Sequence, residues 1–301
     1  MLRLGNGKHL GMGGGILQYL NLIPSPSDDS RAIDDDGPNR YFLLGFGLAR
    51  LPQGLPHEVI VARKIQHFGH AYEVLTQART RSNPIIVNPS VLASNFAKLA
   101  EDCTRIEKAG ADWLHLDVMD GHFVDNISFG PPIVEAISKF ATKPLDTHLM
   151  ISRPDHYYKR FTPLVHNVTI HVETAVDIGG TLQGIRAEGC SAGLAISPPT
   201  PFEKVLPFLE QIDLLLVMTV HPGFGGQPFM PETMEKVRRA DRIKQERDLT
   251  VHVEVDGGIN RTTAQVAREA GANIFVAGTS IFHSADPAKT MAELRGEGRG
   301  S

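Results

Sequence analysis

From Ile85 onward, short runs of branched apolar residues alternate with stretches in which apolar residues recur at helical spacing. Eight such runs begin near Ile85, Asp112, Pro144, Asn167, Ser191, Asp213, Thr250 and Asn273. Their spacing of roughly 27 residues is what one strand, one helix and two short loops need. The pattern predicts a (β/α)8 TIM barrel, with an open doubly wound sheet as the alternative. In a closed barrel, active groups lie at the carboxyl ends of the strands.

The stretch after the first run shows the helical pattern in detail. One apolar stripe is predicted, made of Phe96, Leu99, Ala100, Cys103, Ile106 and Ala109. Gly110 then stands where a helix ends on a left-handed residue, and Gly189 and Gly271 end later helices in the same way.

The first 82 residues do not share this alternation. Six glycines fall within the first 15 residues, and two turn-rich stretches with proline and aspartate follow. We expect residues 1–82 to be an irregular N-terminal extension, either disordered or upstream of the true start, and residues 83–301 to form the barrel. Residues 57–79 could form one short helix. Arg3 and Lys8 give the start a faint likeness to an organellar transit peptide.

Composition narrows the class of protein. The chain has 301 residues, 42% of them hydrophobic, and a formal net charge of -4. The absence of a basic excess argues against a nucleic-acid or membrane-surface partner. No apolar run is long enough for a transmembrane helix. Two cysteines cannot build a disulfide framework, which fits a reducing compartment, and we expect a cytoplasmic protein.

Candidate chemistry begins in the second run, where side chains alternate between two faces. His115, Asp117 and Met119 share one face, which we expect to point into the barrel. The other face is aliphatic and carries Leu114, Leu116 and Val118. An inward histidine and aspartate are costly to bury without a partner, and a metal ion would remove that cost.

The third and seventh runs repeat this arrangement. Asp146, His148 and Met150 share a face of the third run, and His252, Glu254 and Asp256 share a face of the seventh. We therefore predict that one divalent ion per subunit is held by His115, Asp117, His148 and Asp256. Such ligands suit zinc, iron, manganese or cobalt. His171 and Glu173 on the fourth run either support these ligands or lie in solvent at the rim, and they are not counted among them.

Glycine-rich turns end the last three runs. They contain Gly223, Phe224, Gly225 and Gly226, then Gly257 and Gly258, and finally Gly278 and Thr279. Glycine lets backbone N–H groups approach an anion closely, and barrel enzymes often bind phosphate after strands seven and eight. No lysine or arginine is obvious nearby, so we expect backbone dipoles to bind the phosphate.

At these residues the chain resembles a known family. Residues 86–294 are similar to ribulose-phosphate 3-epimerases of the pentose phosphate and Calvin pathways. The resemblance is carried by residues 89–92, 115–124, 146–150, 218–227 and 254–258. It implies a barrel of the ribulose-phosphate-binding type and a small sugar phosphate as substrate.

The resemblance also implies roles for individual residues. Asp117 and Asp256 match the acid/base pair of the family as well as two of its metal ligands. Its substrate contacts match Ser90, His148, Asp256 and the three glycine-rich turns. Its sulfur-lined pocket floor matches Met119, Met150 and Met218. Spacing alone would place these methionines in the core.

The implied reaction inverts C3 of a ketopentose 5-phosphate. One aspartate would remove the C3 proton and the other would return a proton on the opposite face, through a cis-enediolate that the metal stabilises. The chain departs from the family at His221, Asp125 and Pro199, and none of these matches a ligand. His221 could alter the pH dependence or the behaviour of its loop.

Other readings stay open. The nearest alternative is a 3-epimerase of a six-carbon ketose phosphate such as allulose 6-phosphate. A decarboxylase or aldolase on a related barrel usually places a lysine among its strand-end acids, and strands two, three and seven have none. The remaining alternative is a catalytically inactive barrel that acts as a binding subunit. We also expect a homo-oligomer, because many barrels of this kind associate through their outer helices.

Overall fold

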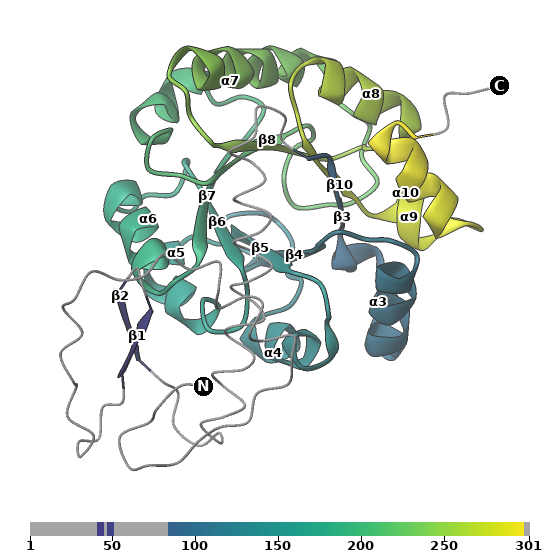
Figure 1. Cartoon of the computed structure of the whole chain (residues 1–301), viewed down its shortest axis with the longest axis horizontal. Coiled ribbons are helices and arrows are strands. Elements are labelled where there is room, and N and C mark those ends of the chain that lie inside the picture. The colour runs from purple at the N-terminus through teal and green to yellow at the C-terminus, as the bar shows by residue number, and fades with distance from the viewer. Residues whose placement is uncertain (1–40, 45–46, 51–83, 298–301) are drawn as a thin grey trace, which may run out of the picture. The chain divides into compact units, whose positions relative to one another are not determined.

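The computed structural model describes residues 41–44, 47–50 and 84–297 (Figure 1). The chain divides into two units, residues 1–69 and 70–301. In the first unit, strands β1 (Tyr41–Leu44) and β2 (Gly47–Arg50) pair antiparallel. The apolar pattern did not predict this hairpin. The other expectations for residues 1–82, including the helix over 57–79, lie outside the described residues.

The second unit contains eight parallel strands. They are β3 (Ile86–Pro89), β4 (Leu114–Met119), β5 (Leu145–Met150), β6 (Asn167–His171), β7 (Ser191–Ile196), β8 (Leu214–Met218), β9 (His252–Asp256) and β10 (Ile274–Ala277). Their spatial order is β3-β10-β9-β8-β7-β6-β5-β4. A single parallel bridge between Ser90 and His115 joins the two end strands. The predicted (β/α)8 barrel is confirmed, and its seam lies at predicted site residues.

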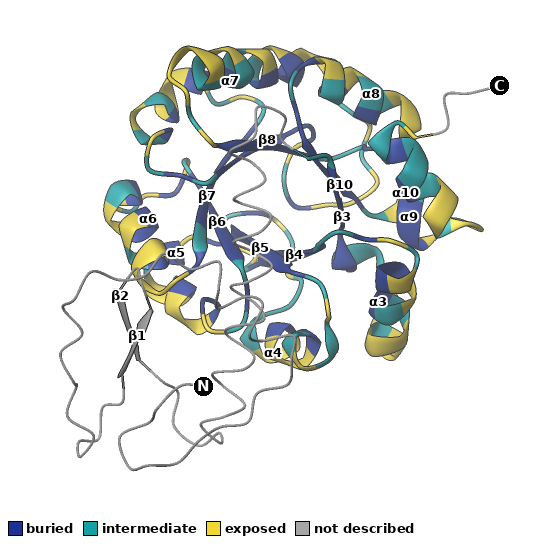
Figure 2. Ribbon diagram, in the orientation of Figure 1, coloured by how far each residue is buried: buried dark blue, intermediate teal, exposed yellow. Residues whose placement is uncertain are grey.

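Helices surround the strands, with their exposed faces outward (Figures 1 and 2). The α-helices are α3 (Leu99–Lys108), α4 (Pro131–Phe140), α5 (Pro154–Tyr157), α6 (Ile178–Ala187), α7 (Met234–Glu246), α8 (Arg261–Glu269), α9 (Thr279–Phe282) and α10 (Pro287–Arg295). The 3-10 helices are η1 (Val91–Ala93), η2 (Phe96–Lys98), η3 (Tyr158–Arg160), η4 (Phe202–Lys204), η5 (Leu206–Phe208) and η6 (Pro231–Thr233). Only η4 and η5 connect β7 to β8, because Pro207 lacks the N–H that an α-helix would need there.

The stripe predicted for the first helix is only partly buried. Cys103 and Ile106 are fully buried, but Phe96 is 52% exposed and Ala100 also faces solvent. For Phe96 the reason is that the segment starts as the 3-10 helix η2 and becomes α-helical only at Leu99, which shifts the phase of the stripe. Ala100 lies within α3 itself, at an exposed position of that helix. Gly110, Gly189 and Gly271 have the predicted positive φ, at 109°, 83° and 111°.

The core has two layers. Leu114, Leu116 and Val118 belong to the large apolar cluster between strands and helices, as strand alternation predicted. A second cluster fills the barrel itself and contains Ile86, Ala195, Leu214, Leu216, Met218, Val220 and Ile274. In the part of the chain that the structure describes, no helix is long and apolar enough to cross a membrane.

Candidate active site

Two neighbouring strands bring the first site residues together. In the parallel register of β4 and β5, His115 lies opposite Asp146 and Asp117 lies opposite His148. All four side chains are buried, because their strands alternate and this face points into the barrel. Asp256 reaches the same place from the end of β9 and keeps 18% of its side chain exposed.

His115 is held by a buried carboxylate. Its Nδ1 donates to Asp146 Oδ2 at 2.7 Å, because a carboxylate oxygen can only accept. Its Nε2 lies 3.2 Å from Asp117 Oδ1 and has no hydrogen-bond partner, although it is buried. A buried acceptor without a partner is unfavourable unless a cation or donor completes it.

The same Asp117 oxygen faces a second imidazole. His148 Nδ1 lies 3.2 Å from Asp117 Oδ1 and 3.9 Å from Asp256 Oδ2. One donor atom from each of His115, Asp117, His148 and Asp256 lies within 4.8 Å of the others. The structure therefore brings the four predicted ligands together, and this cluster could hold a metal ion. Two imidazoles and two carboxylates suit a divalent transition metal.

Electrostatics separates the two carboxylates. Burial opposes the charge on Asp117, but His115 and His148 outweigh it and hold the pKa of Asp117 well below its usual range. Burial and the negative charge of Asp117 raise the pKa of Asp256 to about 7. Burial also lowers the pKa of His148 to about 4. Near neutral pH, Asp117 is ionised, Asp256 can carry a proton and His148 is neutral.

A polar layer lies deeper in the barrel, beneath this cluster. The Asn88 amide donates to Asp146 Oδ2 at 2.7 Å and to Glu254 Oε1 at 2.9 Å. Asn167 donates to the other Asp146 oxygen at 2.6 Å. His115, Asp146 and Glu254 form a second group with metal-ligand geometry. The Asn88 amide nitrogen binds both carboxylates of that group, so it already provides donors there.

Sequence reasoning missed part of this layer. Strand alternation placed Asp146 and Glu254 on the inward faces of their strands, which was a usable signal. Asn88 gave no signal, because it stands alone in an apolar run and its partner Glu254 is 166 residues away in the chain.

Ser90 joins the cluster across the seam of the barrel. Its Oγ donates to Asp117 Oδ2 at 2.6 Å, which leaves Oδ1 for the two imidazoles. Met119 and Met150 pair across β4 and β5 and are buried with Val124. Met218 pairs with Asp256 in register, but it packs in the apolar cluster inside the barrel.

The three glycine-rich turns lie at the carboxyl ends of β8, β9 and β10. Positive φ angles of 122°, 75°, 122° and 64° occur at Gly223, Gly226, Gly257 and Gly258. Asn126, after β4, donates to the Gly223 carbonyl at 2.6 Å, so this loop crosses the mouth to the first turn. No lysine or arginine within residues 84–297 hydrogen-bonds to these turns. Such runs of backbone N–H groups suit an anion.

The three departures from the family pattern all lie at the surface. Asp125, Pro199 and His221 are exposed. None of them contacts the cluster of four predicted ligands among the described hydrogen bonds and ion pairs.

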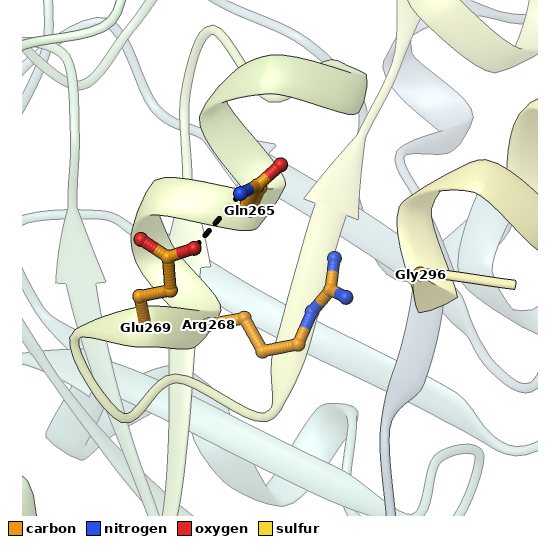
Figure 3. A pocket seen from close by; sticks show the side chains of 4 residues that line it. All are labelled: Gln265, Arg268, Glu269 and Gly296. Atoms are coloured by element: carbon orange, nitrogen blue, oxygen red, sulfur yellow. Dashed lines mark hydrogen bonds between the residues drawn. The ribbon is translucent and has the colours of Figure 1, made fainter. Parts of the chain in front are cut away.

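A separate surface pocket lies between α8 and the end of α10 (Figure 3). It is lined by Gln265, Arg268, Glu269 and Gly296, and Gln265 donates to Glu269 within it. None of these residues comes from a strand end, so this pocket is not the candidate active site.

Known proteins resemble this chain over the barrel. A profile described as the Ribulose-phosphate 3 epimerase family matches residues 86–282. The ribulose-phosphate 3-epimerase of Mycobacterium bovis is 45% identical over 219 residues, covering 72% of this chain and 94% of the relative. The enzyme of that name from Bacillus subtilis is 42% identical over 216 residues, covering 70% of this chain and 99% of the relative.

The fold itself is shared more widely. A solved structure of 3-hexulose-6-phosphate synthase matches with a TM-score of 0.53 at 16% identity, covering 70% of this chain and 99% of the other. At that identity the match supports the barrel fold alone. The family match and the two relatives go further, and on them the chain belongs to the ribulose-phosphate 3-epimerase family of isomerases.

Proposed function

We propose that this chain is a metal-dependent 3-epimerase that interconverts D-ribulose 5-phosphate and D-xylulose 5-phosphate. One observation carries the proposal: Asp117 and Asp256 meet two imidazoles at the mouth of the barrel, beside three glycine-rich turns. Family membership supports the same reaction class. The two relatives described above carry the name of that activity.

The contacts around Asp117 support a bound cation. Asp117 and Asp146 raise the pKa of His115 well above its usual value despite burial, so in the absence of an ion a second proton fits on Nε2, 3.2 Å from Asp117 Oδ1. In a neutral His115 ring whose Nδ1 donates to Asp146, a cation would take the place of that proton and relieve the repulsion between the Nε2 lone pair and Asp117 Oδ1. His115, Asp117, His148 and Asp256 would hold the ion. When bound, a divalent ion supplies Lewis-acid stabilisation for negative charge on the substrate oxygens.

The two aspartates would move the proton at C3. Asp117, whose pKa is held low, starts as the base, while Asp256, whose pKa is near 7, starts with a proton to give. A 1,1-proton transfer needs this pairing, because one group removes a proton from one face and the other supplies one to the opposite face. The reverse reaction exchanges the two roles.

Other residues would orient the substrate. The turns at Gly223–Gly226, Gly257–Gly258 and Gly278–Thr279 would bind the phosphate through backbone N–H groups. Ser90 would fix the Asp117 carboxylate through its 2.6 Å hydrogen bond. Met119, Met150 and Met218 would line the floor with neutral sulfur. Binding the remote phosphate contributes to catalysis by holding C3 between the carboxylates.

A coupled assay with D-ribulose 5-phosphate tests the proposal. The protein is stripped with a chelator and then reloaded separately with zinc, iron, manganese or cobalt. We expect turnover with at least one metal and its loss on stripping. The same assay with D-allulose 6-phosphate should show lower kcat/KM. Absence of turnover on either sugar with every metal would contradict the proposal, and preference for the six-carbon sugar would reassign the substrate.

A further inference from the structure

His148, one of the four predicted metal ligands, has a second contact that points away from the cluster. Its Nε2 lies 2.8 Å from Nε2 of His171, the last residue of β6, and the rings stack with centroids 4.9 Å apart. Both side chains are fully buried. Two ring nitrogens at this distance form a hydrogen bond only if one carries a proton and the other does not.

Glu173 decides which one carries it. Its Oε2 lies 2.8 Å from His171 Nδ1, and a carboxylate can only accept, so His171 Nδ1 carries a proton. In a neutral His171 ring, Nε2 then has the lone pair and must accept from His148 Nε2–H. His148 Nδ1 is left with a lone pair, and it faces Asp117 Oδ1 at 3.2 Å.

Two other arrangements satisfy these contacts. One places protons on both nitrogens of His171 and on Nδ1 of His148, and the other places protons on both nitrogens of His148 and on Nδ1 of His171. Both remove the lone pair that a metal ion requires from His148. A cation bound to His148 Nδ1 therefore selects the first arrangement, in which all three groups form an ordered chain of hydrogen bonds.

Glu173, the last group in this series of hydrogen bonds, is itself held in place by the backbone. The other oxygen of Glu173 accepts from the Ser197 N–H at 2.8 Å, at the start of the loop after β7. Burial acts to raise the pKa of Glu173, but His171, Thr200 and the Ser197 N–H together outweigh it and the pKa falls to about 2. Glu173 keeps 22% of its side chain exposed, so it can be replaced without opening the core.

We propose that Glu173 and His171 form a relay that fixes the tautomer of His148, keeping the Nδ1 lone pair directed at the metal position. The proposal rests on the proposed function, because it requires that His148 binds the ion. His115 has a direct carboxylate partner in Asp146, whereas His148 is connected to its carboxylate through a second imidazole. Glu173 and His171 are positioning residues and do not belong to the cluster of four predicted metal ligands.

Zinc affinity of the full chain, measured by competition with a chromophoric chelator, tests the relay. In Glu173→Gln a single amide oxygen cannot accept from both Ser197 and His171, so the hydrogen bonds from Glu173 to His148 no longer have one fixed direction. We expect zinc to bind about 10- to 100-fold more weakly, the range seen when outer partners of metal ligands are lost. His171→Leu should lower the zinc affinity at least as much. His171→Gln should lower it less than His171→Leu, because the glutamine amide oxygen can still accept from His148.

Lys236 provides a matched control. Its Nζ donates to the carbonyls of Ser197, Pro198 and Thr200 at 2.7, 2.8 and 2.7 Å, so it anchors the same loop as Glu173. It does not contact either imidazole. Lys236 also attracts the charge of Glu173, but Lys236→Met removes none of the hydrogen bonds of the relay. We therefore expect its zinc affinity to stay within about twofold of the original. Circular dichroism and thermal unfolding confirm that each variant is folded.

Nitrogen-15 NMR of the metal-free protein gives a second readout, which a purely structural role would not move; the metal-free protein is used because an ion on Nδ1 would by itself leave the proton on Nε2. We expect His148 to carry its proton on Nε2 in the original chain, with loss of that single tautomer in Glu173→Gln. Unchanged zinc affinity in Glu173→Gln would overturn the relay, as would an equal loss in Lys236→Met. Failure of the unsubstituted protein to bind zinc or any other divalent metal would instead overturn the proposed function.

Discussion

Strands β4 and β8 belong to one barrel, but they present opposite chemistry to its interior. The inward face of β4 carries His115, Asp117 and then Met119, whereas β8 contributes Leu214, Leu216 and Met218 to the apolar interior cluster. Every residue of both strands is buried. The difference therefore does not come from exposure to solvent. It divides the interior into a polar side around β4 to β6, to which β3 and β9 add Asn88, Glu254 and Asp256, and an apolar side around β8.

This division separates stability from chemistry. On the apolar side, burial of side chains is itself favourable, at roughly 25 cal/mol for each Å² removed from water. On the polar side, each buried group costs free energy unless it has a partner, and Asn88, Asp146 and Asn167 supply many of those partners. Some buried polar atoms among the described residues still have no hydrogen-bond partner, including Asn88 Oδ1, Glu254 Oε2 and His115 Nε2, and of these three His115 Nε2 belongs to the proposed metal site.

The largest expected effect is a loss of turnover when a carboxylate on the polar side is replaced. Asp117→Asn and Asp256→Asn each remove a carboxylate that we propose as a proton-transfer group, so we expect kcat to fall by about 10³-fold or more. Steady-state kinetics on D-ribulose 5-phosphate provides the measurement. Asp125→Asn is the control, because this exposed aspartate lies outside the cluster and should leave kcat unchanged. Turnover close to the original in both site variants would rule out the two-carboxylate mechanism.

A substitution on the apolar side should lower the free energy of unfolding and leave metal binding nearly unchanged. Leu216 is fully buried in the interior cluster, and Leu216→Ala leaves a cavity there. We expect the free energy of unfolding of the metal-free protein to fall by about 2–5 kcal/mol, with zinc affinity nearly unchanged. Denaturant unfolding and a zinc titration measure the two quantities. If zinc affinity falls as steeply as stability, the two sides of the interior are not independent.

A smaller effect is expected at the phosphate turns. Gly258 has φ 64°, and a Cβ there would lie 2.5 Å from the Phe229 backbone nitrogen, so Gly258→Ala must displace the turn. We expect KM to rise on the order of tenfold, which is about 1.4 kcal/mol, with little change in zinc affinity. Gly130→Ala is the control, because nothing lies within 4 Å of its Cβ position and Gly130 precedes α4, outside the three glycine-rich turns. Equal KM values for the two variants would argue against phosphate binding by Gly258.

The smallest effect concerns the rim above β4. Asp120 accepts from Ser152, His122 and Phe123, and these hydrogen bonds outweigh burial and lower its pKa to about 2. A carboxylate whose pKa is lower in the folded state stabilises the protein above its unfolded pKa of about 3.9. The stability advantage over Asp120→Asn should therefore be full above about pH 4 and disappear as the pH falls toward 2.

Unfolding in denaturant at a series of pH values measures this difference. A constant difference between the two proteins from pH 5 to about pH 2 would show that the Asp120 charge does not contribute.

Strand alternation was enough to predict which side chains of the site point into the barrel. It separated His115 and Asp117 from Leu114, Leu116 and Val118, because a strand has only two faces and both were readable from residue type. It also placed His148 and Asp256 at strand ends that a closed barrel must bring together. These contacts depend on local periodicity and on one general rule of barrel topology.

Contacts between strands could not be predicted in the same way. The hydrogen bonds from Asn88 to Asp146 and Glu254 depend on register and on the closure of the barrel, which no local pattern encodes. The contact of His148 with His171 likewise depends on how β5 and β6 pair. The predicted burial of Phe96 was wrong, because the segment changes from 3-10 to α-helix at Leu99 and an apolar stripe predicts burial only within one continuous helix.

The central claim is that Asp117 and Asp256 exchange the C3 proton with solvent in a site that needs a divalent ion. NMR of D-ribulose 5-phosphate conversion in D2O tests it directly, with metal-loaded and metal-stripped protein side by side. We predict that the loaded protein forms D-xylulose 5-phosphate with deuterium at C3 and that the stripped protein forms none. Product that retains only protium at C3, or equal conversion by the stripped protein, would contradict the account.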